Sequence, residues 1–331
     1  MPPNPTAHLP GFDNVKVIAP PVEQASPLDV LFIGGAPRSG TTLVDLLLGA
    51  LPGFFSGGEL MFVWERGVRD NQLCGCGQPF HDCPFWSEVG KHAFGGWENV
   101  DLEAILRLRQ HVDRHVNFFP LPGGLRRRTR LELAQLTELL TQLYSSIRAV
   151  SSCNVIIDSS KRPAYAQILR RTPAVRLRIV HCVRDPRAAS FSHSRHVQRP
   201  EITGGIEFMP RYGAFTAAIL WMASNLLIQL VRSPRKRLYY EELTRVPDDA
   251  LSSLLSDLVR SNQQMPVISG MDLTGALALP INHTVAGNPV RFSRAIYLRE
   301  DDEWRSHIRR RDELLTLSLT WPLLLAYGYP R

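Results

Sequence analysis

The chain has 331 residues, enough for one large α/β domain or two small ones with a sizeable buried core. Its 44% hydrophobic and 21% charged residues are ordinary for a soluble globular protein, which excludes a disordered or fibrous class for most of the chain. A formal net charge of +7 favours anionic ligands, because positive potential attracts phosphate and sulfate groups. The basic residues form no aromatic-and-basic recognition motif, so we expect no nucleic-acid partner.

The start of the chain differs from the rest. Residues 1–27 hold seven prolines and little apolar periodicity, which predicts an extended N-terminal lead-in before a single domain over 28–331. No basic segment precedes an apolar core there, so we expect no secretory signal and a cytoplasmic protein. The longest apolar stretches, 215–231 and 314–327, are interrupted by polar residues or a proline, so we expect no membrane span.

Short apolar runs and helical periodicity alternate along the chain. The apolar runs predict buried strands at 28–34, 154–158, 176–183 and 237–240. The periodic segments predict helices at 42–51, 131–150, 164–171, 187–196 and 214–232. This alternation predicts an α/β fold of three layers, α/β/α, with a central parallel sheet covered on both faces.

A glycine-rich turn follows the first predicted strand and reads GGAPRSGTTLVDLLL from Gly34. Backbone N–H groups and a helix N-terminus there make an anion cradle, and Gly35 and Gly40 let the chain approach a phosphate closely. Their spacing matches a nucleotide P-loop, but Thr41 stands where the lysine is expected. That substitution argues against phosphoryl transfer from a triphosphate, although a P-loop kinase or NTPase is the main alternative function.

The run at 37–42 resembles the phosphosulfate loop of sulfotransferases that use 3′-phosphoadenosine 5′-phosphosulfate (PAPS). The resemblance implies a P-loop-like fold in which extra helices and loops form the acceptor pocket. It also implies transfer of sulfonate to a hydroxyl of a small-molecule, glycan or lipid acceptor, with adenosine 3′,5′-bisphosphate (PAP) as product. By the same resemblance, the loop residues that hold the 5′-phosphate and sulfonate are Arg38, Ser39, Gly40, Thr41 and Thr42. The plain alternative is an ordinary strand-to-helix turn.

A second motif, VRDPRAASFSHSR, begins at Val183 after another predicted strand. It resembles the family's 3′-phosphate motif, in which an arginine after the strand and a serine on the next helix grip the phosphate. Arg184 and Ser192 occupy those places, and the planar fork of arginine suits a phosphate dianion. Alternatively, Arg184 and Asp185 form a local ion pair that caps a helix.

Two shorter segments add nucleotide contacts. The run YYEEL resembles the family's tyrosine-glutamate strand end, which implies that Tyr240 approaches the nucleotide; the alternative is an ordinary strand-edge aromatic. The run NHTVAGNPVRF, from Asn282, resembles a late loop that closes over the nucleotide in bacterial members. That resemblance implies that Gly287 and Arg291 contact the 3′-phosphate.

Sulfonyl transfer needs a base for the acceptor hydroxyl and positive charge on the departing oxygen. Glu59, in SGGEL, resembles the base of the tyrosylprotein sulfotransferases; alternatively, it is a helix-capping acid. Lys161, in DSSKRP, matches the family's lysine at the leaving-group oxygen, and Arg38 shares that role. In the competing interpretation Asp158 is a metal ligand and Lys161 a surface cation. With two cations and backbone amides available, we expect no metal requirement.

For several segments the sequence is compatible with more than one role. The run LCGCGQPFHDCPFW brings together Cys74, Cys76, His81 and Cys83, which form a zinc site, a disulfide or a packed, redox-sensitive loop. We expect residues 74–124 and 202–212 to shape the acceptor pocket, with four aromatic side chains: Trp64, Phe85, Trp86 and Trp97. Alternatively, these aromatic side chains belong to the core. Four histidines near the motifs are alternative bases: His181, His193, His196 and His283. A third function class is a catalytically inactive nucleotide-binding protein.

Overall fold

The structure is a computed structural model and describes residues 26–113, 127–258 and 276–329. Five parallel strands form the central sheet in the order β2-β3-β1-β4-β5. Their bounds are β1 (Leu28–Gly35), β2 (Phe54–Ser56), β3 (Val155–Lys161), β4 (Val175–Val183) and β5 (Arg235–Tyr239). A separate antiparallel pair joins β6 (Ala276–Ala278) to β7 (Ala295–Tyr297). Nearly all of the lead-in predicted at 1–27 lies outside the described residues.

The central strand β1 buries both of its faces. Leu28, Val30 and Phe32 pack into the apolar cluster on one side of the sheet. Leu31 and Ile33 pack into a different cluster on the other side. Because successive side chains of a strand point to opposite faces, an unbroken apolar run requires a layer of helices on each side.

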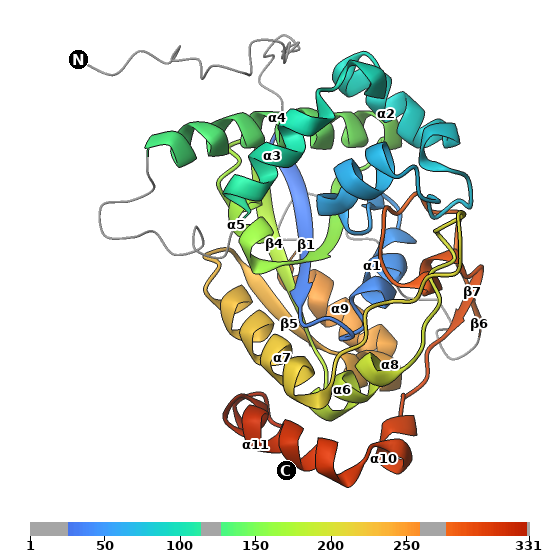
Figure 1. Cartoon of the computed structure of the whole chain (residues 1–331), viewed down its shortest axis with the longest axis vertical. Helices are drawn as coiled ribbons and strands as arrows, with labels where there is room; N and C mark the ends of the chain where they lie inside the picture. Colours follow the sequence, from blue (N-terminus) through green and yellow to red (C-terminus); the bar gives the residue numbers. More distant parts are fainter. Residues whose placement is uncertain (1–25, 114–126, 259–275, 330–331) are drawn as a thin grey trace.

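Helices supply both layers (Figure 1). One face carries α2 (Pro84–Phe94), α3 (Leu102–Val112), α4 (Arg127–Ser151), α5 (Pro163–Arg170) and α7 (Ala214–Gln229). The other face carries α1 (Thr41–Gly49), α8 (Tyr240–Arg245) and α9 (Pro247–Leu258). Helices α6 (Pro186–Ser194), α10 (Glu303–His307) and α11 (Arg310–Ala326) lie at the end of the molecule away from α4. The predicted three-layer α/β/α fold is confirmed.

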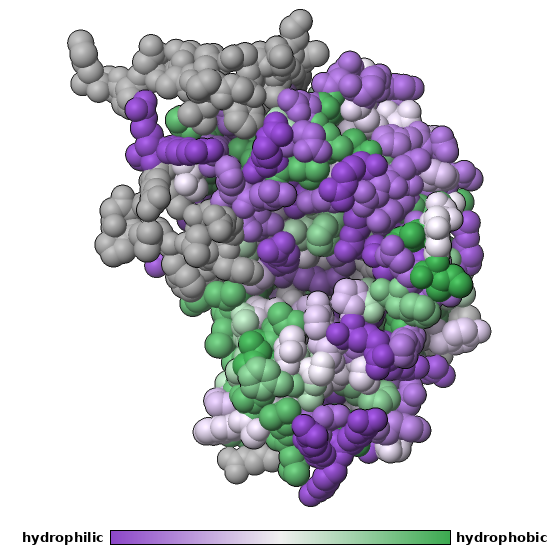
Figure 2. Space-filling model, in the orientation of Figure 1, coloured by the Kyte–Doolittle hydropathy of each residue, from purple (hydrophilic) through white to green (hydrophobic). Residues whose placement is uncertain are grey.

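Short helical turns fill the connections between these elements. They are η1 (Leu60–Phe62), η2 (Val63–Arg69), η3 (Phe80–Asp82), η4 (Trp97–Asn99) and η6 (Pro289–Phe292). Within the described part of the chain, no helix has the length and apolar character that crossing a membrane requires. Apolar side chains nevertheless gather on the surface over α7 and α11 (Figure 2), where Phe215, Leu230 and Trp321 are exposed.

The carboxyl ends of four strands meet at one edge of the sheet. The glycine-rich turn at 37–42 (the phosphate loop) follows β1, Lys161 ends β3, Arg184 follows β4, and Tyr240 follows β5. Parallel strands place all their carboxyl ends on the same side, which is where open α/β sheets bind ligands. The topology therefore gathers residues that lie about two hundred positions apart in the chain.

Candidate active site

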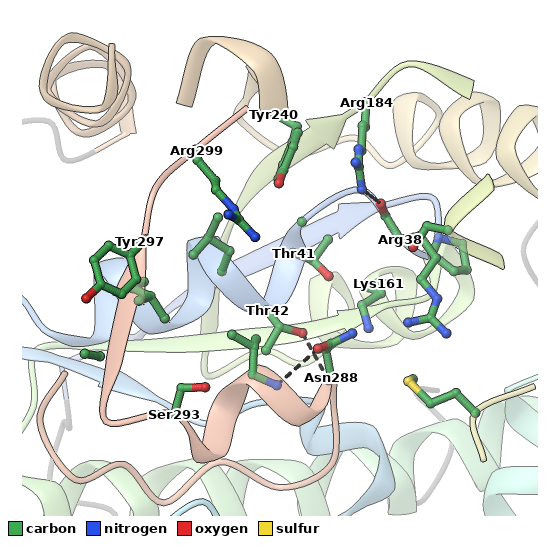
Figure 3. Close-up of a pocket in the computed structure, with 18 residues that line it drawn as sticks. Arg38, Thr41, Thr42, Lys161, Arg184, Tyr240, Asn288, Ser293, Tyr297 and Arg299 are labelled. Atoms are coloured by element: carbon green, nitrogen blue, oxygen red, sulfur yellow. Dashed lines mark hydrogen bonds between the residues drawn. The ribbon is translucent and has the colours of Figure 1, made fainter. Parts of the chain in front are cut away.

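A cavity of about 540 Å³ opens at this edge, within the size range of small-molecule sites. Its wall includes residues from both predicted phosphate-binding turns (Figure 3). Of the predicted site residues, those that line it are Arg38, Gly40, Thr41, Thr42, Lys161, Arg184, Ser192 and Tyr240. Arg38 and Lys161 lie on one side of Thr41, and Arg299 lies on the other.

The phosphate loop has an unusual backbone. Arg38 and Gly40 adopt left-handed conformations, with φ of 70° and 81°. For Arg38 this conformation costs on the order of 1–3 kcal/mol, the kind of strain that gathers at functional sites. At Gly40 an added Cβ would come within 2.4 Å of the Tyr240 ring. Both the strain and the close contact argue against an ordinary strand-to-helix turn.

Two further features of this loop indicate an anion site. The hydroxyl of Ser39 is buried and has no hydrogen-bond partner among the described residues, and Ser39 itself does not line the cavity. Burial and the nearby charge of Arg184 lower the pKa of the Arg38 guanidinium. A partly buried guanidinium that also feels a second positive charge favours a bound anion nearby.

Arg184 is almost completely buried and makes three contacts. Nη1 donates a hydrogen bond to the Arg38 carbonyl at 3.1 Å, and Nη2 donates to the Asp301 carboxylate at 2.7 Å. The guanidinium carbon lies 4.3 Å from the centre of the Tyr240 ring, within the range of a cation–π contact. Tyr240, at the end of the edge strand β5, is therefore part of the cavity wall.

Asp185 does cap a helix, but without Arg184. Its carboxylate accepts a hydrogen bond from the Arg187 backbone N–H at 2.8 Å, at the start of α6. Its ion-pair partner is the Arg187 side chain. The alternative in which Arg184 and Asp185 pair locally is therefore wrong, and Arg184 faces the cavity.

Glu59 and Lys161 form an ion pair at the end of β3. The Lys161 ammonium donates a hydrogen bond to Glu59 Oε1, and the Lys161 backbone is also left-handed, with φ of 67°. Glu59 precedes η1 but makes no side-chain capping bond, so the capping interpretation is wrong. The Glu59 backbone N–H donates to the Val285 carbonyl at 2.7 Å. Glu59 does not line the cavity itself, but its carboxylate is hydrogen-bonded to Lys161, which does.

Asp158 does not face the cavity. It is fully buried and accepts hydrogen bonds from the Ser160 backbone N–H, at 2.9 Å, and from the Tyr144 hydroxyl. Burial raises the pKa of its carboxyl to about 6. The structure therefore contradicts the alternative in which Asp158 is a metal ligand at the nucleotide.

The late loop approaches the phosphate loop at Gly287, one of the two expected residues, and lines the cavity with Asn288, which no prediction named. A Cβ added to Gly287 would lie 3.6 Å from Thr42 Oγ1 and 3.8 Å from Glu59 Oε1, so Gly287 lies beside the phosphate loop. The Asn288 backbone N–H donates to Thr42 Oγ1 at 3.3 Å, and Asn288 lines the cavity. Asn288 belongs to the late-loop motif, but its contact with Thr42 is made by the backbone N–H, which every residue except proline has. The residue type therefore could not predict this contact.

Arg291 is not brought to the cavity. It is 1% exposed, and its guanidinium donates to the carbonyls of Thr284, at 2.7 Å, and Leu73, at 2.8 Å. The turn η6 directs it inward, where it ties two loops together. Arg299 lines the cavity instead, and no sequence motif singled it out.

The four aromatics expected in the acceptor pocket do not line the cavity. Trp64, Trp86 and Trp97 are buried in the main apolar cluster, so their expected place in an acceptor pocket is wrong. Phe85 stacks on Phe55 and on His283, with ring centres 4.6 Å and 4.9 Å apart. From the expected segment 202–212, Met209 lines the cavity.

None of the four candidate histidines lines the cavity. His181 and His193 are buried, and burial lowers the pKa of each to about 4. His181 Nε2 lies 2.8 Å from the Asn225 side-chain oxygen. His196 contacts Arg211 at 2.6 Å, and His283 lies among the cysteines.

Two solved sulfotransferase structures are similar to the chain at low sequence identity. The chain is similar to a sulfotransferase domain from the curacin biosynthetic pathway, at 17% identity and a TM-score of 0.46, over 92% of this chain and 99% of that one. It is also similar to the sulfotransferase STF9 from Mycobacterium avium, at 14% identity and a TM-score of 0.43, over 93% of this chain and 79% of that one. No curated protein matches the chain.

The family comparison covers the first motif. Residues 30–75 match the model described as the sulfotransferase family, and they include most of β1, the phosphate loop and Glu59. The predicted resemblance to the sulfotransferase family is thereby confirmed over the segment that carries these residues.

Proposed function

We propose that the protein is a sulfotransferase that moves the sulfonate group of PAPS onto a hydroxyl of a small-molecule, glycan or lipid acceptor. The observation that carries the proposal is the shared cavity of the two turns: Arg38 and Thr42 line it from the end of β1, and Arg184 and Ser192 line it from the end of β4. Strands β1 and β4 are neighbours in the sheet. We propose a single domain over 28–331 for this activity.

The donor requires two anion sites, and the cavity offers cationic groups for both. The phosphate loop and the hydroxyls of Thr41 and Thr42 suit the 5′-phosphosulfate, because backbone N–H groups and hydroxyls donate to phosphate oxygens. Arg184 and Ser192 suit the 3′-phosphate, with Tyr240 packed on the guanidinium. The Ser39 hydroxyl, which has no hydrogen-bond partner among the described residues, can donate to the 5′-phosphosulfate if the phosphate loop moves.

Glu59 and Lys161 supply the chemistry in this proposal. The Glu59 carboxylate takes the proton of the acceptor hydroxyl as the oxygen forms a bond to sulfur. The bond from sulfur to the bridging oxygen breaks, and its electron pair stays on the 5′-phosphate of the departing PAP. Lys161 and Arg38 stabilise that developing charge from the cavity wall. Because these cations neutralise the leaving group, the proposed step requires no metal.

The kinase alternative has less support. Thr41 replaces the lysine that a P-loop uses on the β- and γ-phosphates, and Asp158 is buried among Ser160 and Tyr144. The inactive nucleotide-binding alternative predicts that PAP binds but that no group is transferred.

Transfer of sulfur-labelled sulfonate from PAPS into a panel of hydroxyl compounds and cell extracts tests the proposal. We expect the wild-type protein to label an acceptor without magnesium, and Glu59→Gln to lower the rate by about 10²–10⁴-fold with PAP affinity retained. Phosphate transfer from ATP and magnesium in place of sulfonate transfer would contradict it. An unchanged rate in Glu59→Gln would remove Glu59 as the base.

A further inference from the structure

Three cysteines and one histidine meet in a compact cluster beside the active site. Cys83 Sγ lies 3.6 Å from Cys74 Sγ, 3.7 Å from Cys76 Sγ and 3.3 Å from His283 Nδ1. Cys74 Sγ lies 3.7 Å from the same histidine nitrogen. All four atoms lie within 4.8 Å of one another, so every member of the set faces a common centre.

These spacings fit one tetrahedral metal ion. Zinc bonds to thiolate sulfur at about 2.3 Å and to histidine nitrogen at about 2.0–2.1 Å, which places tetrahedral ligand atoms roughly 3.5–3.8 Å apart. Four of the six separations, at 3.3–3.7 Å, are close to that geometry, and the other two do not exceed 4.8 Å. An iron–sulfur cluster spreads its ligands over more than one iron, so it fits this tight set less well. A disulfide would use two of the thiols and leave the histidine without a role.

We propose that Cys74, Cys76, Cys83 and His283 bind a structural zinc ion. Three thiolates and an imidazole are a ligand set of structural zinc sites, and four protein ligands leave no open position for catalysis. The fourth ligand comes from His283, two hundred residues beyond Cys83, and not from His81. The His81 ring contacts the Val68 carbonyl at 2.9 Å instead.

Contacts around the cluster orient the four side chains. The Trp86 indole donates to the His283 carbonyl at 2.9 Å, and Phe85 stacks on the imidazole with an interplanar angle of 15°. The Gly75 backbone N–H donates to the Thr284 carbonyl at 3.1 Å. A Cβ at Gly75 would come within 1.9 Å of the Asn282 side chain, so the cysteine turn packs directly on the histidine segment. Such outer contacts orient the ligands of metal sites.

The metal site would stabilise the position of the segment 57–59, which carries Glu59. Val285, two residues after His283, pairs with the glycine turn on both sides: its N–H donates to the Gly57 carbonyl at 3.0 Å, and its carbonyl accepts from the Glu59 N–H at 2.7 Å. The same loop continues to Asn288 at the phosphate loop. A metal that joins 74–83 to His283 therefore stabilises the backbone pairing of Val285 with Gly57 and Glu59, although its ligands do not line the cavity.

Metal analysis of the purified wild-type chain tests this proposal without reference to activity. We expect about one zinc per chain after exhaustive gel filtration in metal-free buffer. His283→Ala and Cys83→Ser should each lower the zinc content by about tenfold or more. Two matched controls should keep it: His81→Ala, the neighbouring histidine of the same segment, and Cys153→Ser, a buried cysteine outside the cluster.

Three results would overturn the proposal. They are a wild-type chain without metal after growth with added zinc, a disulfide among the three cysteines in the freshly isolated protein, and zinc that is lost in His81→Ala but kept in His283→Ala. If a variant does not fold, cobalt exchanged into the wild-type chain decides instead. The proposal predicts the intense visible bands of tetrahedral cobalt with thiolate charge transfer, and a pale octahedral spectrum contradicts it.

Hydrogen exchange tests the structural role. After removal of the metal by a chelator, we expect the amides of Glu59 and Val285 to exchange about tenfold faster or more. The amides that join β1 to β4 should be unaffected and serve as the internal control. Unchanged exchange at Glu59 and Val285 after complete metal loss would contradict the proposed support of this pairing.

Discussion

Asp301 holds the guanidinium of Arg184 at 2.7 Å, although the two residues are 117 positions apart. Arg184 is the group that we propose binds the 3′-phosphate, so a carboxylate stands where an anionic ligand would bind. The Asp301 side chain is one-third exposed, whereas that of Arg184 is 7% exposed. The carboxylate keeps the buried guanidinium paired, and a phosphate must displace it or share the cation with it.

Removing that competitor should strengthen nucleotide binding. We expect Asp301→Asn to tighten PAP binding by about fivefold, or about 1 kcal/mol, since the phosphate no longer competes with a partly exposed carboxylate. Calorimetric titration with PAP measures the effect. Asp302→Asn is the matched control, because that neighbour pairs with Arg305 in solvent and should leave the affinity unchanged. Weaker binding in Asp301→Asn would mean that Asp301 positions Arg184 and does not compete.

Gly40 allows the phosphate loop to pack against Tyr240. We expect Gly40→Ala to weaken PAP binding by tenfold or more, about 1.4 kcal/mol, because the new Cβ would meet the Tyr240 ring and shift the loop. Gly328→Ala is the control: it has a similar φ of 77°, but nothing lies within 4 Å of its added Cβ. Equal PAP affinity in the two variants would show that the contact with Tyr240 does not shape the site.

Lys161 should act on the rate of transfer more than on donor affinity. We expect Lys161→Ala to lower the rate of sulfonate transfer by about 10²–10³-fold, because charge on the departing oxygen loses its cation. Arg162→Ala is the matched control, since its side chain is 41% exposed and pairs with Asp113. Steady-state kinetics with PAPS provides the measurement. Equal losses in both variants would point to a general effect of charge or folding.

His181 should make stability depend on pH. Burial, followed by the charges of Arg237 and Arg235, lowers the pKa of His181 from 6.5 to about 4, while its Asn225 hydrogen bond acts in the opposite direction. Between these values the unfolded chain binds a proton that the folded chain does not, so stability falls as the pH drops from 6.5 to 4.

We expect His181→Gln to remove up to one proton from this slope, or about 1.4 kcal/mol per pH unit. Urea unfolding at several pH values measures it. The buried carboxyls of Asp45 and Asp158, whose pKa values are raised to about 7 and about 6, act with the opposite sign and remain in both proteins. The difference between the two proteins therefore isolates His181, and identical slopes would contradict the assignment.

Local patterns predicted four of the five strands of the central sheet, and residues of both predicted phosphate-binding turns line one cavity. The apolar run of β1 and the residues that follow β3, β4 and β5 belong to continuous segments, and parallel topology alone brings strand ends together. No local sequence pattern predicted which distant segments contact each other. His283 and not His81 joins the cysteines, because the late loop packs on the cysteine turn.

The late loop shows most clearly that the sequence does not predict the direction of side chains in irregular segments. Arg291 lies only four residues after Gly287, yet η6 turns it into the interior, where backbone carbonyl groups accept its hydrogen bonds. From beyond β7, Arg299 reaches the cavity and Asp301 reaches Arg184, with no motif around either residue. Whether a side chain points inward or outward from an irregular loop depends on packing partners elsewhere in the chain, which residue order does not reveal.

The affinity ratio of PAP to adenosine 5′-phosphate tests the central claim most directly, because the two ligands differ only in the 3′-phosphate. Calorimetric titration without magnesium should show that the wild-type chain binds PAP at least about thirtyfold more tightly, or about 2 kcal/mol. In Arg184→Ala most of that preference should disappear. Equal affinity for the two nucleotides in the wild-type chain, or an undiminished preference for PAP in Arg184→Ala, would contradict the claim that both turns bind one bisphosphate nucleotide.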